Sequence, residues 1–406
     1  GYHVEVKTIF EAENLGKLAE KLVATCVMVE AEIPAGDIPA TAAQMRIYTA
    51  QSISGGTAYN VPYVFKVKTL NPDRLQTAVD HLVARHEILR TRFENRDGII
   101  MQVVDDSARC QVEKLSSNDF SAFIRPFDLG TAPLLQVGYY GNTVLLDMHH
   151  IITDGGSMPT FLRELNGLYM GRDLVDTPVQ YRAFAAQEKT CPEDEAYWLS
   201  VFADEPPILE INTDYPRPGK QSFVGAAIYQ SIPAALHEKV CSKSKVMSIT
   251  PYAYYIGVYY ILLSKFSGNE DIVIGTPTSG RRGKFLNTLG MFVNTLALRG
   301  RPEGTKTVRD FLSEVKTAVV GALAHQDYPY GDLVKKLEIH PEGRNPLFDV
   351  MFAYQSEEMT QVSFGDAPAE LLPIPVTSSK YDFTFNVMPR KENVVLMVEY
   401  CTALFK

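Results

Sequence analysis

The feature that most constrains the fold is the alternation of helix and strand patterns along a chain of 406 residues. Apolar residues recur at helical spacing in Pro72–His86 and Pro159–Tyr169, whereas Thr143–Ile152 is β-branched and apolar, as buried strands are. The second half repeats the pattern, with one strand and two helices expected at Ile272–Gly275, Thr250–Phe266 and Val308–His325. Mixed order of this kind predicts an α/β architecture with helices packed on sheets.

A chain of this length is too long for one small core and suits two packed lobes. Glu13–Val23 has the spacing of a short amphipathic helix, and Ile33–Ala40 has the proline and glycine content of a linker. Glu205–Gly225 is rich in proline, aspartate and glycine, and we expect it to connect the lobes. The predicted units are therefore an N-terminal piece, a linker and two lobes, at residues 1–25, 26–38, 39–204 and 205–406.

Charge and hydropathy exclude several classes of protein. Lys and Arg total 39 against 48 Asp and Glu, a net charge of −9, and the chain has no dense basic run. Such a chain repels phosphate backbones, which argues against a nucleic-acid partner. The longest apolar stretch, Tyr252–Leu263, is too short and too polar to span a bilayer, and no apolar leader opens the chain. We therefore expect a cytoplasmic protein with no membrane partner.

The cysteines point to a reducing compartment. They are five in number, scattered, and without C-x-x-C spacing, which argues against a disulfide framework and against a zinc site. We expect each to be a small buried apolar side chain; the five are Cys26, Cys110, Cys191, Cys241 and Cys401.

The most informative segment runs from Met148 to Ser157 and reads Met-His-His-Ile-Ile-Thr-Asp-Gly-Gly-Ser. Because side chains alternate along a strand, His150 shares a face with Met148 whereas His149 points to the other face. The two histidines therefore cannot both act on one substrate. A histidine at a strand end is commonly a structural group, so spacing alone leaves the catalytic and the structural interpretation equally open.

The residues after the strand also suit a reaction site. Asp154-Gly155-Gly156 is expected to form a tight turn in which glycine permits special backbone conformations, with Ser157 as the cap of the next helix. A carboxylate at Asp154 can anchor an arginine through a bidentate pair. The glycine amides, at a helix start, can face a developing negative charge.

Acyl transfer is the chemistry that such a histidine suits. An α-amine has a pKa of about 8, and an imidazole with a pKa of about 6.5 can accept or relay the proton that it sheds on attacking a thioester. No serine or cysteine nucleophile is needed, because a thioester is already activated. Asp154–Ser157 also resembles the Gly-Gly-x-Ser stretch of carrier proteins, but the preceding strand with two histidines argues against that interpretation.

His149–Gly155 matches in full the His-His-x-x-x-Asp-Gly motif of the condensation domains of nonribosomal peptide synthetases, and the chain resembles that family from residue 40 to 406. The opening block carries threonine at Thr41 where the family has serine. Further blocks that resemble the family follow in the expected order, at Thr41–Tyr48, Arg85–Phe93, Ile274–Arg281, Gly290–Thr295, His325–Tyr330 and Arg344–Phe348.

The resemblance implies two lobes, each like a chloramphenicol acetyltransferase subunit, forming a V-shaped pseudo-dimer with an active-site tunnel between them. It implies that His150 is the catalytic base or positions the amine, and that Asp154 is mainly structural and paired with an arginine, for which Arg46 is the candidate. Ser279 is expected to help hold the tetrahedral intermediate. The implied catalytic residues are His150, His149, Asp154 and Gly155, supported by Arg46 and Ser279.

The implied reaction joins a donor aminoacyl or peptidyl thioester to the α-amine of an acceptor aminoacyl thioester. Both substrates ride on 4'-phosphopantetheine arms of upstream and downstream peptidyl carrier proteins, and an adenylation domain is adjacent. The domain itself is expected to be a monomer that binds no cofactor or metal, in antibiotic or siderophore biosynthesis. Residues 1–25 resemble the last part of a peptidyl carrier protein, which favours a donor of L configuration.

Other residues in the blocks receive weaker expectations. His86 and His325 are expected to be scaffold groups, whereas Arg281 and Arg282 fit equally well a solvated pair or a surface facing an acidic carrier. Two rival functions share the fold, an epimerisation domain and a non-catalytic docking module. The blocks at Gly290–Thr295 and His325–Tyr330 favour condensation over epimerisation, and docking relatives usually lose the second histidine, which this chain keeps.

Overall fold

The computed structural model of the chain describes residues 2–3, 23–24, 36–188, 190–339, 343–355, 362–390 and 393–406. Two short strands, β1 (Tyr2–His3) and β2 (Val23–Ala24), pair with each other in antiparallel fashion. The last residue of the expected helix at Glu13–Val23 lies in β2 and not in a helix. The other residues of that helix, the rest of the predicted carrier remnant at 1–25 and most of the linker at 26–38 lie outside the described residues.

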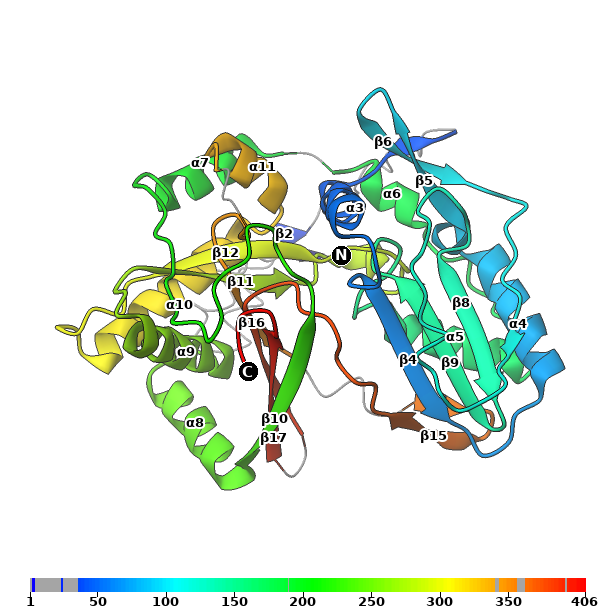
Figure 1. Cartoon of the computed structure of the whole chain (residues 1–406). Helices are drawn as coiled ribbons and strands as arrows, with labels where there is room; N and C mark the ends of the chain where they lie inside the picture. The colour runs from blue at the N-terminus through cyan, green and yellow to red at the C-terminus, as the bar shows by residue number, and fades with distance from the viewer. Residues whose placement is uncertain are drawn as a thin grey trace.

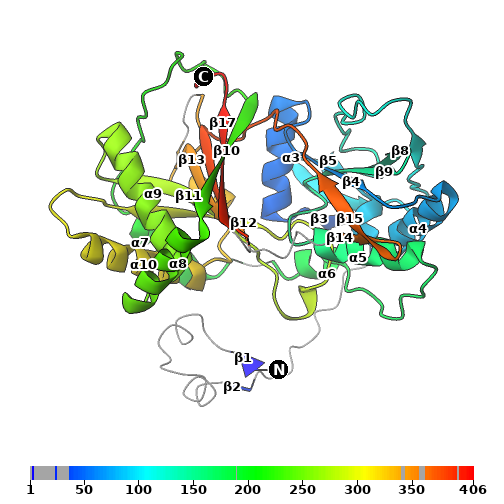
Figure 2. The same ribbon diagram turned by 90° about the horizontal axis from the view of Figure 1, so that it is seen from below.

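Two α/β lobes lie side by side, with α3 near the junction between them (Figures 1 and 2). The first lobe is built on a sheet of order β14-β15-β4-β9-β8-β7, antiparallel except between β7 and β8, and on a smaller sheet of order β3-β6-β5. Its strands are β3 (Ile38–Pro39), β4 (Asn60–Lys66), β5 (Thr91–Arg96), β6 (Ile99–Val104), β7 (Glu113–Lys114), β8 (Leu135–Tyr140), β9 (Thr143–His149), β14 (Val362–Phe364) and β15 (Ala367–Leu372). Its helices are α3 (Ala42–Ser54), α4 (Pro72–Arg85), α5 (Met158–Tyr169) and α6 (Tyr181–Ala185), with a 3-10 turn at Glu87–Arg90.

The second lobe is built on a sheet of order β10-β17-β16-β13-β11-β12, in which β13 runs parallel to both its neighbours and the other pairs are antiparallel. Its strands are β10 (Gly225–Pro233), β11 (Ile272–Thr278), β12 (Asn294–Gly300), β13 (Val350–Tyr354), β16 (Phe383–Pro389) and β17 (Asn393–Cys401). Its helices are α7 (Pro192–Val201), α8 (Ala234–Val246), α9 (Pro251–Ser267), α10 (Val308–Ala324) and α11 (Tyr330–Lys336), with a 3-10 turn at Gly283–Phe285.

The predicted helices form where the sequence supplies caps and an apolar face. Asn71 and Thr307 accept hydrogen bonds from the first turns of α4 and α10, which satisfies backbone donors that a helix end leaves unpaired. The face of α4 that the spacing predicted is buried. The α/β prediction is confirmed, and so are the helices expected in both halves of the chain.

The predicted strand at Thr143–Ile152 ends earlier than expected. Its ladder with β4 stops at the pair of His149 with Asn60, and the next amide, of His150, bonds to the Tyr59 carbonyl oxygen at 2.8 Å. The chain then turns, because the Ile152 N–H donates to the His149 carbonyl oxygen at 3.0 Å. His150 therefore lies on the turn that leaves the sheet, where its ring is not confined between strands.

The two lobes exchange segments, so the expected division at residues 204 and 205 is not followed by the packing. Strand β15, from the second half of the chain, pairs with β4 and extends the first lobe's sheet. The connection from β11 to β12 enters the first lobe's core through four buried side chains. These are Phe285, Leu289, Met291 and Phe292.

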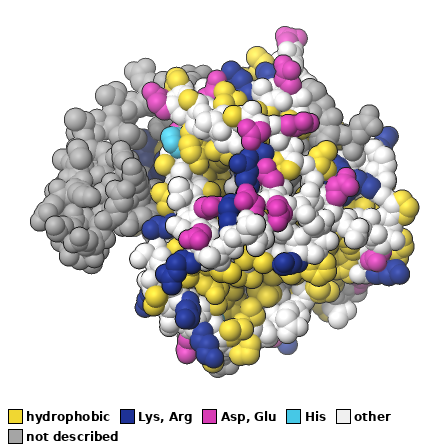
Figure 3. Space-filling view, turned by 90° about the vertical axis from the view of Figure 1, so that its left-hand side faces the viewer, with side chains coloured by type: hydrophobic (Ala, Val, Ile, Leu, Met, Phe, Trp, Pro, Cys, Tyr) yellow, Lys and Arg dark blue, Asp and Glu magenta, His cyan; other side chains and the backbone are white. Residues whose placement is uncertain are grey.

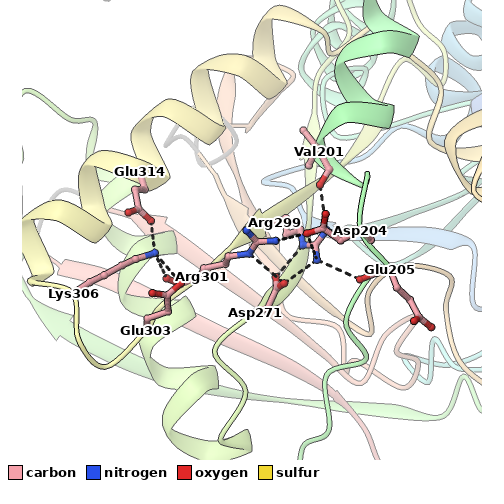
Figure 4. A network of polar contacts seen from close by, with 9 residues as sticks. All are labelled: Val201, Asp204, Glu205, Asp271, Arg299, Arg301, Glu303, Lys306 and Glu314. Carbon is pink, nitrogen blue, oxygen red and sulfur yellow. Dashed lines mark hydrogen bonds and ion pairs between the residues drawn. The ribbon is translucent and has the colours of Figure 1, made fainter.

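Helix α7 also departs from the expected division, because it comes before residue 205 but packs in the second lobe. Trp198 on this helix is buried in the second lobe's core, and its indole N–H donates to the His325 carbonyl oxygen at 2.9 Å. Figure 4 shows Arg299 of β12 reaching both Asp271 and the backbone after α7. Residues 192–205 therefore belong structurally to the second lobe.

The outer face of the second lobe carries exposed apolar side chains on α8 and α9. Figure 3 shows hydrophobic side chains gathered on this side of the molecule, next to a group of charged side chains. The exposed apolar residues of the two helices include Leu236, Val246, Val258, Leu262 and Phe266. Among the described residues, no single helix is both long enough and apolar enough to cross a membrane. Helices α8 and α9 reach that length and hydropathy only when they are taken together, and they are bent by 104° relative to each other.

We predict that Phe292→Ala lowers the free energy of unfolding by about 3 kcal/mol, because the ring is 3% exposed and contacts the rings of Tyr181 and Phe184 in the other lobe. Urea and thermal melting would measure the loss. The matched control is Phe266→Ala, whose ring is 67% exposed and should lose less than about 1 kcal/mol. Equal losses would contradict the role given to the exchanged segment.

Candidate active site

His149 is a buried structural residue. Its side chain is fully buried, packs on the rings of Tyr59 and Phe127, and accepts a hydrogen bond at Nδ1 from the Ile151 N–H at 3.2 Å. A side chain with no exposed surface cannot meet a substrate without a rearrangement. The structure therefore favours a scaffold role for His149 over the catalytic role that we predicted.

His150 has the placement of a working group. It lies just beyond β9 on the turn that leaves the sheet, and the residue is partly exposed, unlike His149. Its Nδ1 atom is buried and has no hydrogen-bond partner among the described residues. A polar atom left without a partner inside a protein is unfavourable, and such atoms mark places where a ligand or water completes the site.

Asp154 anchors an arginine, but that arginine is Arg281. The Asp154 carboxylate lies 2.6 Å from Arg281 Nη1, and the two side chains are 0% and 5% exposed. It also accepts from the N–H groups of Ser157, at 3.0 Å, and Phe292, at 2.9 Å. The prediction that Arg46 pairs with Asp154 is therefore wrong. Arg281 was expected either to be solvated or to face a carrier, and both expectations for it are also wrong.

Ser157 and Gly156 serve this ion pair. Ser157 precedes α5, but its side chain makes no capping hydrogen bond; its hydroxyl accepts from Arg281 Nη2 at 2.6 Å and contacts the Gly290 carbonyl oxygen at 2.9 Å. A Cβ atom on Gly156 would lie 2.5 Å from Arg281 Nη1. Glycine is needed there for space, and not for the special backbone conformation that we predicted, since neither Gly155 nor Gly156 has a positive φ.

Gly155 presents an open backbone amide. The residue is exposed, a Cβ atom there would meet nothing within 4 Å, and its N–H donates to no group among the described residues. Ser279 is also exposed and directly follows β11. It stands two residues before Arg281. The ion pair between Arg281 and Asp154 therefore brings the loop of Ser279 against the turn after β9, residues 150–156, which we call the histidine turn. No hydrogen bond of Ser279 is present among the described residues, and its role stays a prediction.

Two residues of the site were missed by sequence reasoning, Lys380 and Tyr381, which precede β16 in the second lobe. Lys380 Nζ lies 4.5 Å from the centroid of the Tyr59 ring. Tyr381 contacts the Arg46 guanidinium through its hydroxyl. Arg46 therefore belongs to the site, although with a different partner from the one predicted. Neither residue lies in a block that the resemblance singled out, and only their placement across the lobe junction reveals them.

The electrostatics of the site favour an uncharged His150. Burial, and then the positive charge of Lys380, lower the pKa of His150 to about 3, and the same two causes lower the pKa of His149 to about 3. Burial lowers the pKa of Lys380 to about 8, with Glu399 opposing the shift and Arg46 adding to it. Near neutral pH the site thus holds a neutral imidazole beside two cations.

Two histidines outside the motif have the scaffold roles expected of them. His86 Nε2 lies 2.7 Å from a Glu164 carboxylate oxygen, and His325 Nδ1 lies 2.7 Å from an Asp194 carboxylate oxygen. Arg282, next to Arg281, forms an exposed ion pair with Asp327 at 2.8 Å. None of these three contacts belongs to the histidine turn.

A comparison with protein families decides what the chain is. The family described as Condensation domain matches residues 35–406, most of the chain. The chain is a condensation domain. The assignment made from the histidine motif and the blocks around it is confirmed, and the relatives of this domain are nonribosomal peptide synthetases.

The curated relatives are much longer than this domain. The chain is 37% identical over 432 residues to gramicidin S synthase 2 of Brevibacillus brevis, covering 99% of the chain and 10% of the relative. It is 37% identical to tyrocidine synthase 3 of Brevibacillus parabrevis, covering 99% of the chain and 7% of the relative. It is 36% identical to surfactin synthase subunit 2 of Bacillus subtilis (strain 168), covering 91% of the chain and 11% of the relative. The chain spans about a tenth of their length.

Solved structures agree on the fold. The X-domain from teicoplanin biosynthesis superposes with a TM-score of 0.83 at 20% identity, covering 94% of this chain and 93% of that one. The condensation domain of the monacolin K polyketide synthase MokA gives 0.79 at 21% identity, covering 91% and 93%. The first condensation domain of the calcium-dependent antibiotic synthetase, with a substrate analogue, gives 0.75 at 18% identity, covering 92% of each chain. The predicted two-lobed α/β fold is confirmed by these neighbours.

We predict that Arg281→Met destabilises the condensation domain by roughly 3 to 5 kcal/mol, because it leaves the buried Asp154 carboxylate without its counter-ion. Thermal melting would measure the loss. The matched control, Arg282→Met, breaks an exposed pair and should cost less than about 1 kcal/mol. Adding Asp154→Asn to Arg281→Met should restore part of the stability; if the double variant loses the sum of both single losses, the two groups are not coupled.

We also predict that His149 makes the domain less stable in mild acid. Its pKa is about 3 when folded and about 6.5 when unfolded, so between these pH values only the unfolded chain takes up the proton. Stability therefore falls as the pH drops below 6.5, by roughly 1.4 kcal/mol per pH unit for this group. Asp147, whose pKa burial raises to about 7, acts in the opposite direction over much of the range.

The measurement that isolates His149 compares the wild type with His149→Asn, whose amide oxygen can still accept from the Ile151 N–H. Urea unfolding at pH 7 and at pH 5 should show a smaller loss for the variant than for the wild type. Parallel losses in the two proteins would mean that His149 takes up its proton equally in the folded and unfolded states.

Proposed function

We propose that this condensation domain forms an amide bond between a donor aminoacyl or peptidyl thioester and the α-amine of an acceptor aminoacyl thioester. The observation that carries the proposal is His150, a partly exposed residue on the turn after β9 whose neutral imidazole has an unpartnered nitrogen. Acyl transfer from a thioester to an amine needs no enzyme nucleophile, only groups that orient the amine and accept the developing charge.

His150 acts mainly by positioning. An imidazole whose pKa is about 3 is a weak base toward an amine of pKa about 8, so full proton abstraction is unfavourable. A neutral imidazole nitrogen can still accept a hydrogen bond from the amine N–H and direct the nitrogen lone pair at the carbonyl carbon. Of the two roles that the resemblance implies, base and positioner, the electrostatics support the second.

Asp154 and Gly155 prepare the turn for this role. Asp154 holds the turn against the second lobe through Arg281, and Gly155 offers an open amide N–H to a substrate oxygen. Ser279 stands on the adjoining loop and is proposed to contact the intermediate. In the V-shaped arrangement that the resemblance implies, the two substrates reach His150 through a tunnel from opposite faces.

The partners proposed for the domain follow from its relatives. Gramicidin S synthase 2 and tyrocidine synthase 3 are far longer than this chain, as multidomain synthetases are. We propose that peptidyl carrier proteins deliver both substrates on 4'-phosphopantetheine arms, that an adenylation domain is adjacent, and that the domain works as a monomer in the cytoplasm. No cofactor of its own is invoked in this chemistry.

We predict that His150→Ala lowers the rate of dipeptide formation by at least about a hundredfold, because the amine loses the group that orients it. Mass spectrometry of carrier-bound products, after mixing the domain with a loaded donor and a loaded acceptor carrier, would measure the rate. The control is His81→Ala, which alters an exposed histidine of α4 and should leave the rate unchanged.

The same assay tests the alternatives. Near-normal turnover by His150→Ala would remove the role given to this histidine. A folded wild type that inverts a carrier-bound residue without joining two residues would be an epimerisation domain, and one that does neither would fit a docking module. A panel of L and D donors in this assay would also identify the accepted configuration.

A further inference from the structure

Lys380 is placed in the site by the second lobe. Its carbonyl oxygen accepts from Gln221 Nε2 at 2.8 Å and from Asn345 Nδ2 at 3.1 Å, which fixes the backbone from which the side chain extends. The Nζ atom lies 4.5 Å from the centroid of the Tyr59 ring, a cation–π contact that stabilises the charged form. The carbonyl oxygen of Tyr59 in turn accepts a hydrogen bond from the backbone N–H of His150 at 2.8 Å. The charge of Lys380 also lowers the pKa of the His150 imidazole, so these two groups from different lobes act on one another.

Lys380 and Arg46 have no carboxylate partner. Among the described residues, no carboxylate oxygen lies within 4.0 Å of either cation, whereas Arg281 forms a buried ion pair with Asp154. Burial of an unpaired cation costs several kcal/mol unless hydrogen bonds or a counter-ion offset it. Lys380 and Arg46 are each partly buried and their charges repel one another, so an anion that arrives with the substrate is the expected counterpart.

The groups that act on Lys380 come from both lobes. From β9 and its turn the site faces His149 and His150, both neutral. From the region of α3 it faces Tyr59 and Arg46, and from its own segment Tyr381, whose pKa is raised by burial. Glu399 on β17 is the acid whose charge raises the pKa of Lys380. Burial raises the pKa of Glu399 itself, and Ser379 forms a hydrogen bond with its carboxyl group. Glu399 is the only acid among these groups, and its charge opposes the lowering of the Lys380 pKa without cancelling it.

We propose that Lys380 is a further catalytic residue, whose ammonium group contacts the carbonyl oxygen of the donor thioester and stabilises the negative charge that develops there. The inference rests on the proposed amide-forming function and adds to it the group that receives the charge. His150 then serves the nitrogen of the acceptor, and Lys380 serves the oxygen of the donor, so the two lobes each contribute one side of the reaction.

The step balances without any other reactant. The amine lone pair forms the N–C bond while the C=O π pair moves onto the oxygen beside Lys380. When the C=O bond forms again, the C–S bond breaks and the thiolate leaves. The nitrogen loses one proton and the thiolate gains one, so the products are an amide and a thiol. Lys380 keeps its proton throughout, and its charge acts only where negative charge appears.

The first test replaces the charge and keeps the length of the side chain. Lys380→Met should lower kcat by roughly a hundredfold, with a much smaller change in KM for the loaded carriers, because the contact strengthens in the transition state. The matched control is Lys284→Met, which removes an exposed lysine that lies over the ring of Phe285 at 5.6 Å. That control should keep the wild-type kcat. Melting curves would show that both variants are folded.

The second test measures how kcat depends on pH. A lysine with a merely structural role would not make kcat fall as that lysine loses its proton. The pKa of Lys380 is about 8, so the wild-type kcat should fall as the pH rises above this value and the ammonium loses its proton. Lys380→Arg keeps its charge at these pH values and should lose that alkaline limb. Reactions without the domain would correct for hydrolysis of the thioester in base.

The outcomes separate this inference from the proposed function. If the wild type forms no dipeptide, the proposed function fails. If the wild type is active and Lys380→Met has an unchanged kcat, only the role of Lys380 is overturned. A raised KM at constant kcat would make Lys380 a ground-state binding residue and would also overturn the inference. If Lys380→Met does not fold, the pH profiles of the wild type and Lys380→Arg decide the question, and identical alkaline limbs would count against it.

Discussion

The buried ion pair between Asp154 and Arg281 is the interaction on which the rest of the site depends. It joins the histidine turn of the first lobe to the loop after β11 of the second, and both side chains are almost without exposed surface. The carboxylate is further satisfied by the amides of Ser157 and Phe292, so the cost of burying the charge is offset by several donors. Because this pair fixes the turn, it also fixes where His150 stands relative to the second lobe.

The exchange of segments makes this joint rigid in more than one place. The connection between β11 and β12 fills the first lobe's core with aromatic rings, and β15 extends that lobe's sheet through backbone hydrogen bonds to β4. Tightly packed interiors transmit small displacements to their neighbours. The lobes therefore form one frame, and a site built from residues of both can hold a geometry that loops alone would not maintain.

The chemistry follows from a division of charge within that frame. Burial keeps both histidines neutral. Lys380 and Arg46 are cations near neutral pH, and neither has a carboxylate partner in the described part of the chain. A neutral imidazole suits an amine, and a cation suits the oxygen of a thioester that becomes negative as the amine attacks. This division explains why a site without a serine or cysteine nucleophile can still serve acyl transfer.

The sequence by itself determined the α/β class, the main helices, the family and the importance of the turn at His150, because periodicity and motifs are local along the chain. The resemblance to the family also implied that Asp154 pairs with an arginine. Only the tertiary structure decided that this arginine is Arg281 and that the charge of Lys380 acts on His150, because each interaction joins residues more than a hundred positions apart. It likewise showed that Gly156 is needed for space and that His149 is buried. Such choices depend on which surfaces two lobes bring together, and local spacing carries no information about that.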